Sequence, residues 1–158
     1  MAQTLGSLID ALTIKDIREF HLRLMLEAGV QRFSKAALRS KLAVLAGQKK
    51  QLIFEIDGYI AVAAVSRLAL RDEKLKLYNP KDSMGRIPLS PSIAEAISGL
   101  ARKNLELWHL EDEARRTDVS LSYIGKIKKK IDFANQQRND FIDRIDELFE
   151  NIVRKPKK

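Results

Sequence analysis

The chain has 158 residues and a mass of 18.0 kDa, with 45% hydrophobic and 32% charged residues and a formal net charge of +8. That length corresponds to one domain, which buries enough surface to fold without a disulfide or a metal. The chain contains no cysteine, which excludes thiol catalysis, zinc–thiolate sites, iron–sulfur clusters and a disulfide scaffold. Seven glycines and four prolines are few, so the composition favours long helices.

The N-terminal segment is not expected to be a secretory signal, and no run is expected to span a membrane. The N-terminal segment MAQTLGSLIDAL has no basic region and reaches Asp10 early, which is not typical of a secretory signal. The longest apolar run, Tyr59 to Val65, is far shorter than the ~18–20 residues of a membrane-spanning helix. We therefore expect a soluble, cytoplasmic protein. Residues 154–158 form a basic tail, and Pro156 ends the helical pattern.

Two helices are predicted in the first half of the chain. The first covers about residues 7–28, with Ser7 at a start that resembles a capping box and Gly29 as its natural end. The second covers about residues 34–77 and begins at a serine, with a bend expected near Gly58.

A connector over residues 78–91 separates these helices from two more, because it holds three of the four prolines and a glycine. The third helix starts with Ser90 as its N-cap and Pro91 at its first position. It ends near Thr117. The fourth helix covers about residues 119–153.

Two of these helices carry an apolar seam with steps of three and four residues. The fourth helix is expected to begin with Asp118 or Ser120 as its N-cap. Its seam is interrupted only by Arg138, and the seam of the second helix is interrupted only by Lys49. Such seams predict antiparallel packing of neighbouring helices. The seam positions are Leu38, Leu42, Leu45, Lys49, Leu52, Ile56, Tyr59 and Ala63, then Ile124, Ile127, Ile131, Ala134, Arg138, Phe141, Ile145, Leu148 and Ile152.

The two halves of the chain resemble each other. His21 and His109, the two histidines, are 88 residues apart, and Lys49 and Arg138, the basic seam residues, are 89 apart. Helical periodicity does not explain matched polar residues, so we interpret the halves as a repeat. The expected fold is all-α, a four-helix bundle built from two repeated antiparallel helical hairpins.

In this interpretation residues 1–158 form a single domain. The first hairpin covers residues 5–77 and the second covers residues 92–153, with the connector between them and the basic tail behind. An apolar surface on the extension of the second helix is expected to cover the connector or to form a dimer contact. Its residues are Ile60, Ala63, Ala64 and Leu68.

The second hairpin has the richest polar cluster. These residues resemble an uncharacterised bacterial all-helical family, the domain of unknown function designated four-two-five-four, over about residues 91–150. The matching residues are Trp108, His109, Leu110, Glu111, Asp112 and Arg115, then Ile131, Asp132, Asn135, Gln136, Arg138, Asp140, Ile145 and Asp146. The resemblance implies no established activity, only a context beside cell-surface polysaccharide glycosyltransferases. The segment from Gly6 to Lys15 also resembles the N-terminal segment of another uncharacterised helical family.

Two sets of residues resemble the metal ligands of helical metalloproteins. Glu106 and His109 lie three apart on one helix face, as in di-iron bundles, but the matching position in the first half is Arg18. Acidic residues near Glu111 and near Asp146 loosely resemble the magnesium ligands of all-α phosphate-ester hydrolases. Neither set assigns a metal, a cofactor or a catalytic residue.

The basic seam residues leave two interpretations open. A buried arginine requires a carboxylate partner, so Arg138 and Lys49 are expected either in a structural polar layer or in a pocket for a small anion. His109 is expected to be an interior histidine beside Trp108. The candidate residues for the layer or pocket are Trp108, His109, Glu111, Asp112, Arg115, Asn135, Arg138, Asp146, His21 and Lys49.

Three functional hypotheses follow. The first is a non-enzymatic helical accessory or interaction protein that binds a protein partner or a second copy, with a link to cell-envelope polysaccharide synthesis. The second is a small anionic-ligand-binding protein or a metal-dependent hydrolase of phosphate esters. The third is a nucleic-acid-binding helical module, although the one tight basic cluster is expected to be a solvated face. That cluster is Lys126, Lys128, Lys129 and Lys130.

Overall fold

The computed structural model is all-helical, as predicted. It contains four α-helices, and the residues that it describes include no strand. Those residues are 3–29, 32–66, 87 and 92–154.

Helix α1 spans Leu5–Ala28. Its N-cap is Thr4, whose hydroxyl accepts from the Ser7 N–H at 3.2 Å, while the Ser7 hydroxyl accepts from the Thr4 N–H at 2.9 Å. The predicted start at Ser7 was therefore wrong by three residues, because Ser7 is the inner member of a capping box rather than the cap. Gly29 ends the helix with a positive φ of 64°, and its N–H donates to the Met25 carbonyl.

Helix α2 spans Lys35–Ala63. Its N-cap is Ser34, whose side chain accepts from the Ala37 N–H at 3.1 Å. The helix continues through Gly58 without interruption. The prediction extended this helix to residue 77, and residues 67–77 lie outside the described part of the chain.

Helix α3 spans Ile93–Ala114. Its N-cap is Ser92, which forms a capping box with Glu95. The prediction of Ser90 as the cap was wrong, because only Ser92 has a glutamate three residues later that returns the hydrogen bond. The helix also ends earlier than the expected Thr117.

Helix α4 spans Leu121–Arg154. Of the two predicted caps, Ser120 takes the role, since its hydroxyl accepts from the Tyr123 N–H at 3.1 Å. Asp118 pairs instead with Arg116 in the turn before the helix.

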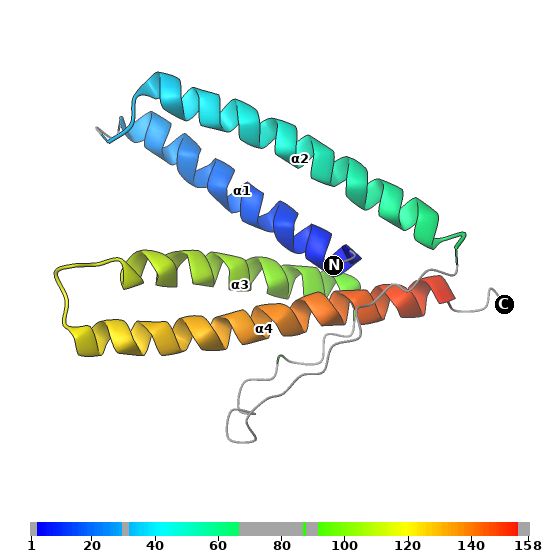
Figure 1. Cartoon of the computed structure of the whole chain (residues 1–158). Helices are drawn as coiled ribbons and strands as arrows, with labels where there is room; N and C mark the ends of the chain where they lie inside the picture. Colours follow the sequence, from blue (N-terminus) through cyan, green and yellow to red (C-terminus); the bar gives the residue numbers. More distant parts are fainter. Residues whose placement is uncertain (1–2, 30–31, 67–86, 88–91, 155–158) are drawn as a thin grey trace.

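The helices pack as two adjacent pairs, α1 beside α2 and α3 beside α4, and α1 contacts both α3 and α4 (Figure 1). The pairs lie closest at the end that holds the N-terminus and diverge toward the two helix–helix turns. The main core lies at the end where the helix pairs are closest, and it includes Leu5, Ala63, Leu100 and Phe149. A second core, which includes Leu107 and Ile131, comes from α3 and α4 alone.

The buried residues follow the predicted seams, except that the buried face of α4 shifts partway along the helix. On α2, the buried residues are Leu38, Leu45, Leu52 and Ala63, all seam positions. On α4 the buried face shifts after Arg138, so that Ile142 and Phe149 are buried while Ile152 is exposed. An α-helix has 3.6 residues per turn, so a strict heptad seam rotates away from a fixed contact over several turns.

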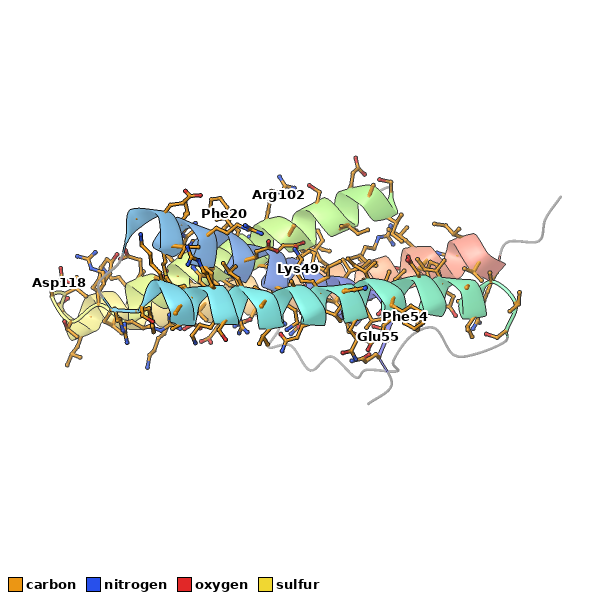
Figure 2. The ribbon with its side chains drawn as sticks, turned by 90° about the horizontal axis from the view of Figure 1, so that it is seen from above. Phe20, Lys49, Phe54, Glu55, Arg102 and Asp118 are labelled. Carbon is orange, nitrogen blue, oxygen red and sulfur yellow. The ribbon has the colours of Figure 1, made fainter. Side chains whose placement is uncertain are left out.

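Helix α2 is the outermost element. It lies nearest the viewer in Figure 2, and its main contacts are with α1. Large apolar side chains remain exposed on it, Phe54 among them. None of the helices in the described part of the chain has the length and apolar composition of a membrane-spanning segment.

Candidate functional site

A buried carboxylate, Asp10 of α1, is the centre of a polar layer. The Arg138 guanidinium of α4 donates to both of its oxygens, with Nε–Oδ1 2.9 Å and Nη2–Oδ2 2.7 Å. The Asn104 amide of α3 donates to Asp10 Oδ1 at 2.9 Å and to Thr13 Oγ1 at 2.7 Å. Arg138 also donates to Asn135 Oδ1 at 3.4 Å. Three helices are therefore joined through one carboxylate.

The sequence predicted that Arg138 needs a carboxylate partner, but it did not identify Asp10 as that partner. Arg138 interrupts the apolar seam of α4, which indicates an interior polar position. Asp10 lies in a different helix pair, 128 residues away from Arg138. The available signal was the position of Asp10 as a lone acid in the apolar segment LGSLIDAL.

A second buried carboxylate, Asp146 of α4, lies at the N-terminal end of α1. Its Oδ1 accepts from the Gly6 N–H at 2.6 Å. The first turn of α1 contains no acidic residue of its own, so Asp146 supplies negative charge at the positive end of that helix. A side chain at Gly6 would collide with the Ile142 carbonyl, which explains why glycine is needed at this close approach.

Lys49 of α2 is paired entirely with α1. Its Nζ lies 2.5 Å from Asp16 Oδ1 and 2.6 Å from Glu19 Oε2. Hydrogen bonds to Asp16 and then Glu19 raise the pKa of Lys49 above its ordinary value. The hydrogen bond from Lys49 is in turn the largest of the effects that lower the pKa of Glu19. Both basic seam residues thus find carboxylates on α1.

The two histidines lie near each other, toward the end of the molecule where the two helix pairs diverge. His21 stacks on Trp108 with ring centroids 4.6 Å apart and planes 9° apart. His109 is edge-on to His21 at 6.4 Å. His109 is exposed, not the interior histidine that the sequence predicted, because it lies on the outer side of α3 from the α4 contact. His21 Nε2 is buried and has no hydrogen-bond partner among the described residues.

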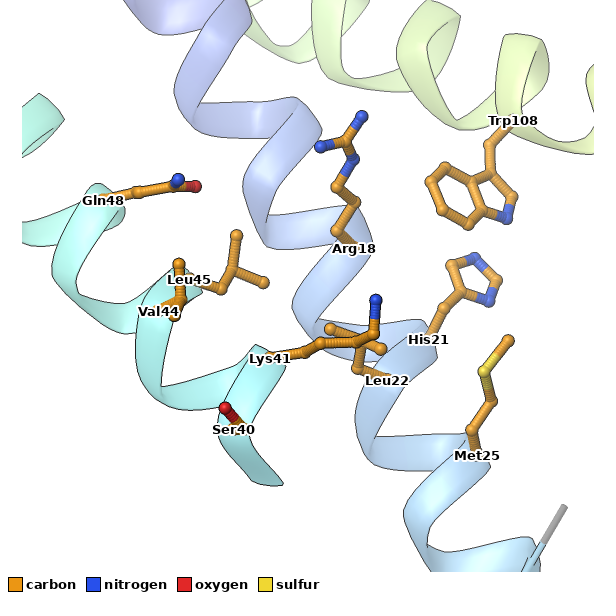
Figure 3. Close-up of a pocket in the computed structure, with 10 residues that line it drawn as sticks. All are labelled: Arg18, His21, Leu22, Met25, Ser40, Lys41, Val44, Leu45, Gln48 and Trp108. Carbon is orange, nitrogen blue, oxygen red and sulfur yellow. The ribbon is translucent and has the colours of Figure 1, made fainter. Parts of the chain in front are cut away.

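A cavity of about 410 Å³ opens beside this stack, between α1, α2 and Trp108 (Figure 3). Two cationic side chains, Arg18 and Lys41, contribute to its wall, and no acidic side chain does. Neither cation makes an ion pair with any other described residue. The remaining lining residues are His21, Leu22, Met25, Ser40, Val44, Leu45, Gln48 and Trp108.

A second cavity of about 360 Å³ shares Arg18 and Trp108 with the first. Five of the candidate residues from the sequence meet at its wall, namely Trp108, Glu111, Arg115, Asn135 and Arg138. Its charges largely compensate each other, since Arg138 binds Asp10 and Arg115 lies 3.9 Å from Glu111. The other candidates, His109, Asp112, Asp146 and Lys49, line neither cavity. The sequence missed Arg18 and Lys41, because neither interrupts a seam.

An exposed ion network stabilises the turn between α3 and α4. Arg116 pairs with Glu113 at 3.1 Å and with Asp118 at 2.8 Å. The Tyr123 hydroxyl donates to Glu113 at 2.9 Å. That hydrogen bond is the largest cause of the lowered pKa of Glu113, and it raises the pKa of Tyr123. Asp112 and Arg115 form a separate exposed pair at 3.0 Å.

Two other sequence hypotheses concern surface groups. The four lysines of the basic cluster at residues 126–130 are all exposed on α4. In the part of the chain that the structure describes, no three histidine or acidic side chains are grouped as metal ligands.

The second helix pair has a family match. Residues 94–158 match the family described as Protein of unknown function (DUF4254). This match confirms the resemblance found in the sequence and covers α3 and α4. No curated protein and no solved structure matches the chain.

Proposed function

We propose that the chain is a non-enzymatic binding protein that holds a small organic anion in the cavity between α1, α2 and Trp108. The observation that carries the proposal is the pair of cations, Arg18 and Lys41, at a cavity wall that contains no acidic side chain (Figure 3). Cations that share a concave site and have no carboxylate partner attract an anionic group and form charge-assisted hydrogen bonds with it.

The rest of the lining favours a ligand with an apolar body. Leu22, Met25, Val44 and Leu45 supply apolar walls, and the cavity volume lies in the range of small-molecule sites. His21 Nε2 is buried without a partner, and such a nitrogen is stabilised by a polar ligand atom that reaches it. We infer a carboxylate or phosphate monoester on an aliphatic or aromatic body.

The lining also favours binding over catalysis. Among the residues that line the cavity, Ser40 carries the one hydroxyl, and it is not hydrogen-bonded to His21. Nucleophilic catalysis needs a nucleophile held by a base, and the described lining residues contain no such pair.

Trp108 is the chain's single tryptophan, so its fluorescence reports on the cavity directly. The titrants are hexanoate, hexyl phosphate and the neutral hexan-1-ol. We expect a saturable change with at least one of the two anions, a much weaker response to the alcohol, and at least tenfold weaker binding in Arg18→Gln and Lys41→Gln. The control, Lys129→Gln on the exposed face of α4, should bind as the wild type does. Equal responses to the anions and the alcohol would refute the proposal.

An interaction protein is the second candidate, because α2 leaves large apolar side chains uncovered. We also infer that the two helix pairs are repeats of one hairpin within a four-helix bundle. The proximity of His21 to His109 supports this, as does the pairing of Lys49 and Arg138 with α1 carboxylates. Location in the cytoplasm and a role beside cell-envelope polysaccharide synthesis stay predictions.

A further inference from the structure

The second cavity, of about 360 Å³, adjoins the first one. Arg18 of α1 and Trp108 of α3 belong to the walls of both cavities. The other residues that line the second cavity come from α1, α4 and the C-terminal half of α3 with its C-cap, and none comes from α2. A ligand whose anionic group is held at Arg18 therefore has this second space within reach.

The charges of the second cavity favour an uncharged ligand group. Arg138 already binds Asp10, with Nη2 2.7 Å from Oδ2, and Arg115 Nη1 lies 3.0 Å from Asp112 Oδ1. Glu111, the one acidic residue of the lining, lies 3.9 Å from Arg115. A further charge placed here would need a counter-ion of its own, whereas a neutral polar group needs only hydrogen bonds.

Asn104 brings an unused hydrogen-bond acceptor to this wall. The residue is only 4% exposed, and its amide nitrogen donates to Asp10 Oδ1 at 2.9 Å and to Thr13 Oγ1 at 2.7 Å. These two bonds use both amide hydrogens. The side-chain oxygen of Asn104 accepts a hydrogen bond from none of the described residues. Because a buried acceptor without a partner costs free energy, a ligand donor that reaches it is bound favourably.

Asn135 of α4 brings an unused donor to the same wall. Its side-chain oxygen accepts from Arg138 Nη1 at 3.4 Å, while its amide nitrogen has no hydrogen-bond partner in the described part of the chain. The cavity thus offers an acceptor from α3 and a donor from α4. A hydroxyl is the smallest neutral group that both donates and accepts a hydrogen bond.

We propose that the second cavity binds a hydroxyl group of the same ligand whose anionic group binds at Arg18 and Lys41. The hydroxyl donates to Asn104 Oδ1 and accepts from Asn135 Nδ2. The ligand class is therefore a hydroxylated organic anion, a hydroxy acid or the phosphate monoester of a diol or polyol. An analogue without the hydroxyl leaves both amide groups unpaired, so it binds less tightly. This inference rests on the proposed function and adds the chemical class of the ligand.

Matched pairs of anions test the proposal on the full chain, with Trp108 fluorescence as the readout. Straight-chain carboxylates and alkyl phosphates of four, six and eight carbons are titrated with and without a hydroxyl at the far end. We expect the hydroxylated form to bind at least about fivefold more tightly at one or more lengths. If the alkyl end stayed in the first cavity, the hydroxyl would be buried against apolar walls and would weaken binding. Equal or weaker binding of the hydroxylated form at every length would overturn the proposal.

A substitution of Asn135 tests which residue recognises the hydroxyl. Asn135→Leu keeps the approximate size of the side chain and removes its donor, so the preference for the hydroxylated anion should fall below about twofold. Asn139→Leu is the matched control, because Asn139 is exposed on α4 and lines neither cavity, and it should keep the full preference. A preference that persists in Asn135→Leu would refute the assignment. Anion binding without any preference contradicts this inference alone, whereas no response to any anion contradicts the proposed function and this inference together.

Discussion

Arg138 and Asp10 form a bidentate ion pair that joins α4 to α1 across 128 residues of sequence. Asn104 donates to the same carboxylate, so α3 is held by it as well. Asp10 is buried and Arg138 is partly buried, so the loss of either partner leaves the other charge in a poorly solvated place without its counter-ion. The pair therefore specifies how the second helix pair meets the first.

Asp10→Asn should be strongly destabilising. The substitution leaves Arg138 without its carboxylate, and breaking a buried pair in this way costs about 3 kcal/mol of unfolding free energy. Urea denaturation followed by circular dichroism measures the change. Asp16→Asn is the comparison, because Asp16 is half exposed in its pair with Lys49 and should cost less than about 1 kcal/mol. Equal losses in the two variants would show that the Asp10 layer has no special weight.

Gly99→Ala should destabilise the contact between α3 and α4. A side chain at Gly99 would overlap the buried Phe141 ring, and such overpacking costs about 1–3 kcal/mol. Gly125→Ala on α4 meets no atom within 4 Å and should stabilise by about 0.5–1 kcal/mol, because alanine favours the helix. Thermal melts of both variants show whether each is less or more stable than the wild type. A stabilised Gly99→Ala would contradict the packing of Gly99 against Phe141.

Stability should depend on pH through Lys49 and Glu19. The pKa of Glu19 is lowered from 4.5, so its contribution is present above that value and is lost as pH falls through the lowered pKa. The pKa of Lys49 is raised from 10.5, so its contribution is present below that value and is lost as pH rises through the raised pKa. The melting-temperature difference between wild type and Lys49→Met should be constant between these limits and shrink outside them. Lys50→Met, at an exposed neighbour, should show no such window.

His21→Ala should shift Trp108 emission to longer wavelength. The imidazole covers one face of the indole at 4.6 Å, and its removal lets water reach the ring. His109→Ala is the control, because His109 is exposed and has no ring contact with Trp108. An unchanged spectrum in His21→Ala would show that the stack is not populated in solution.

Local sequence signals located the helices well and their first residues less well. Ser34, Ser120 and Gly29 are the caps that the sequence indicated. Thr4 and Ser92 were missed in favour of neighbouring serines, since several hydroxyls near a helix start satisfy the same pattern. Which of them caps the helix depends on the residue three positions later and on where the first turn meets the core.

The candidate site was harder to predict for a physical reason. Arg138 was found because a charge on an apolar seam is anomalous along one helix. Arg18 and Lys41 are ordinary surface residues along α1 and α2, and only the packing of these two helices against each other, with Trp108 beside them, brings both to one cavity. A site formed between helices leaves little periodic signal in any single helix.

The sequence by itself determined four helices, their seams and the demand of two basic residues for carboxylates, because these follow from periodicity and from the cost of an unpaired charge. The tertiary structure alone decided that both carboxylate sets belong to α1 and that the two helix pairs diverge on either side of Trp108. These outcomes depend on contacts between residues far apart in the chain, and such contacts are set by packing of the whole molecule rather than by any local pattern.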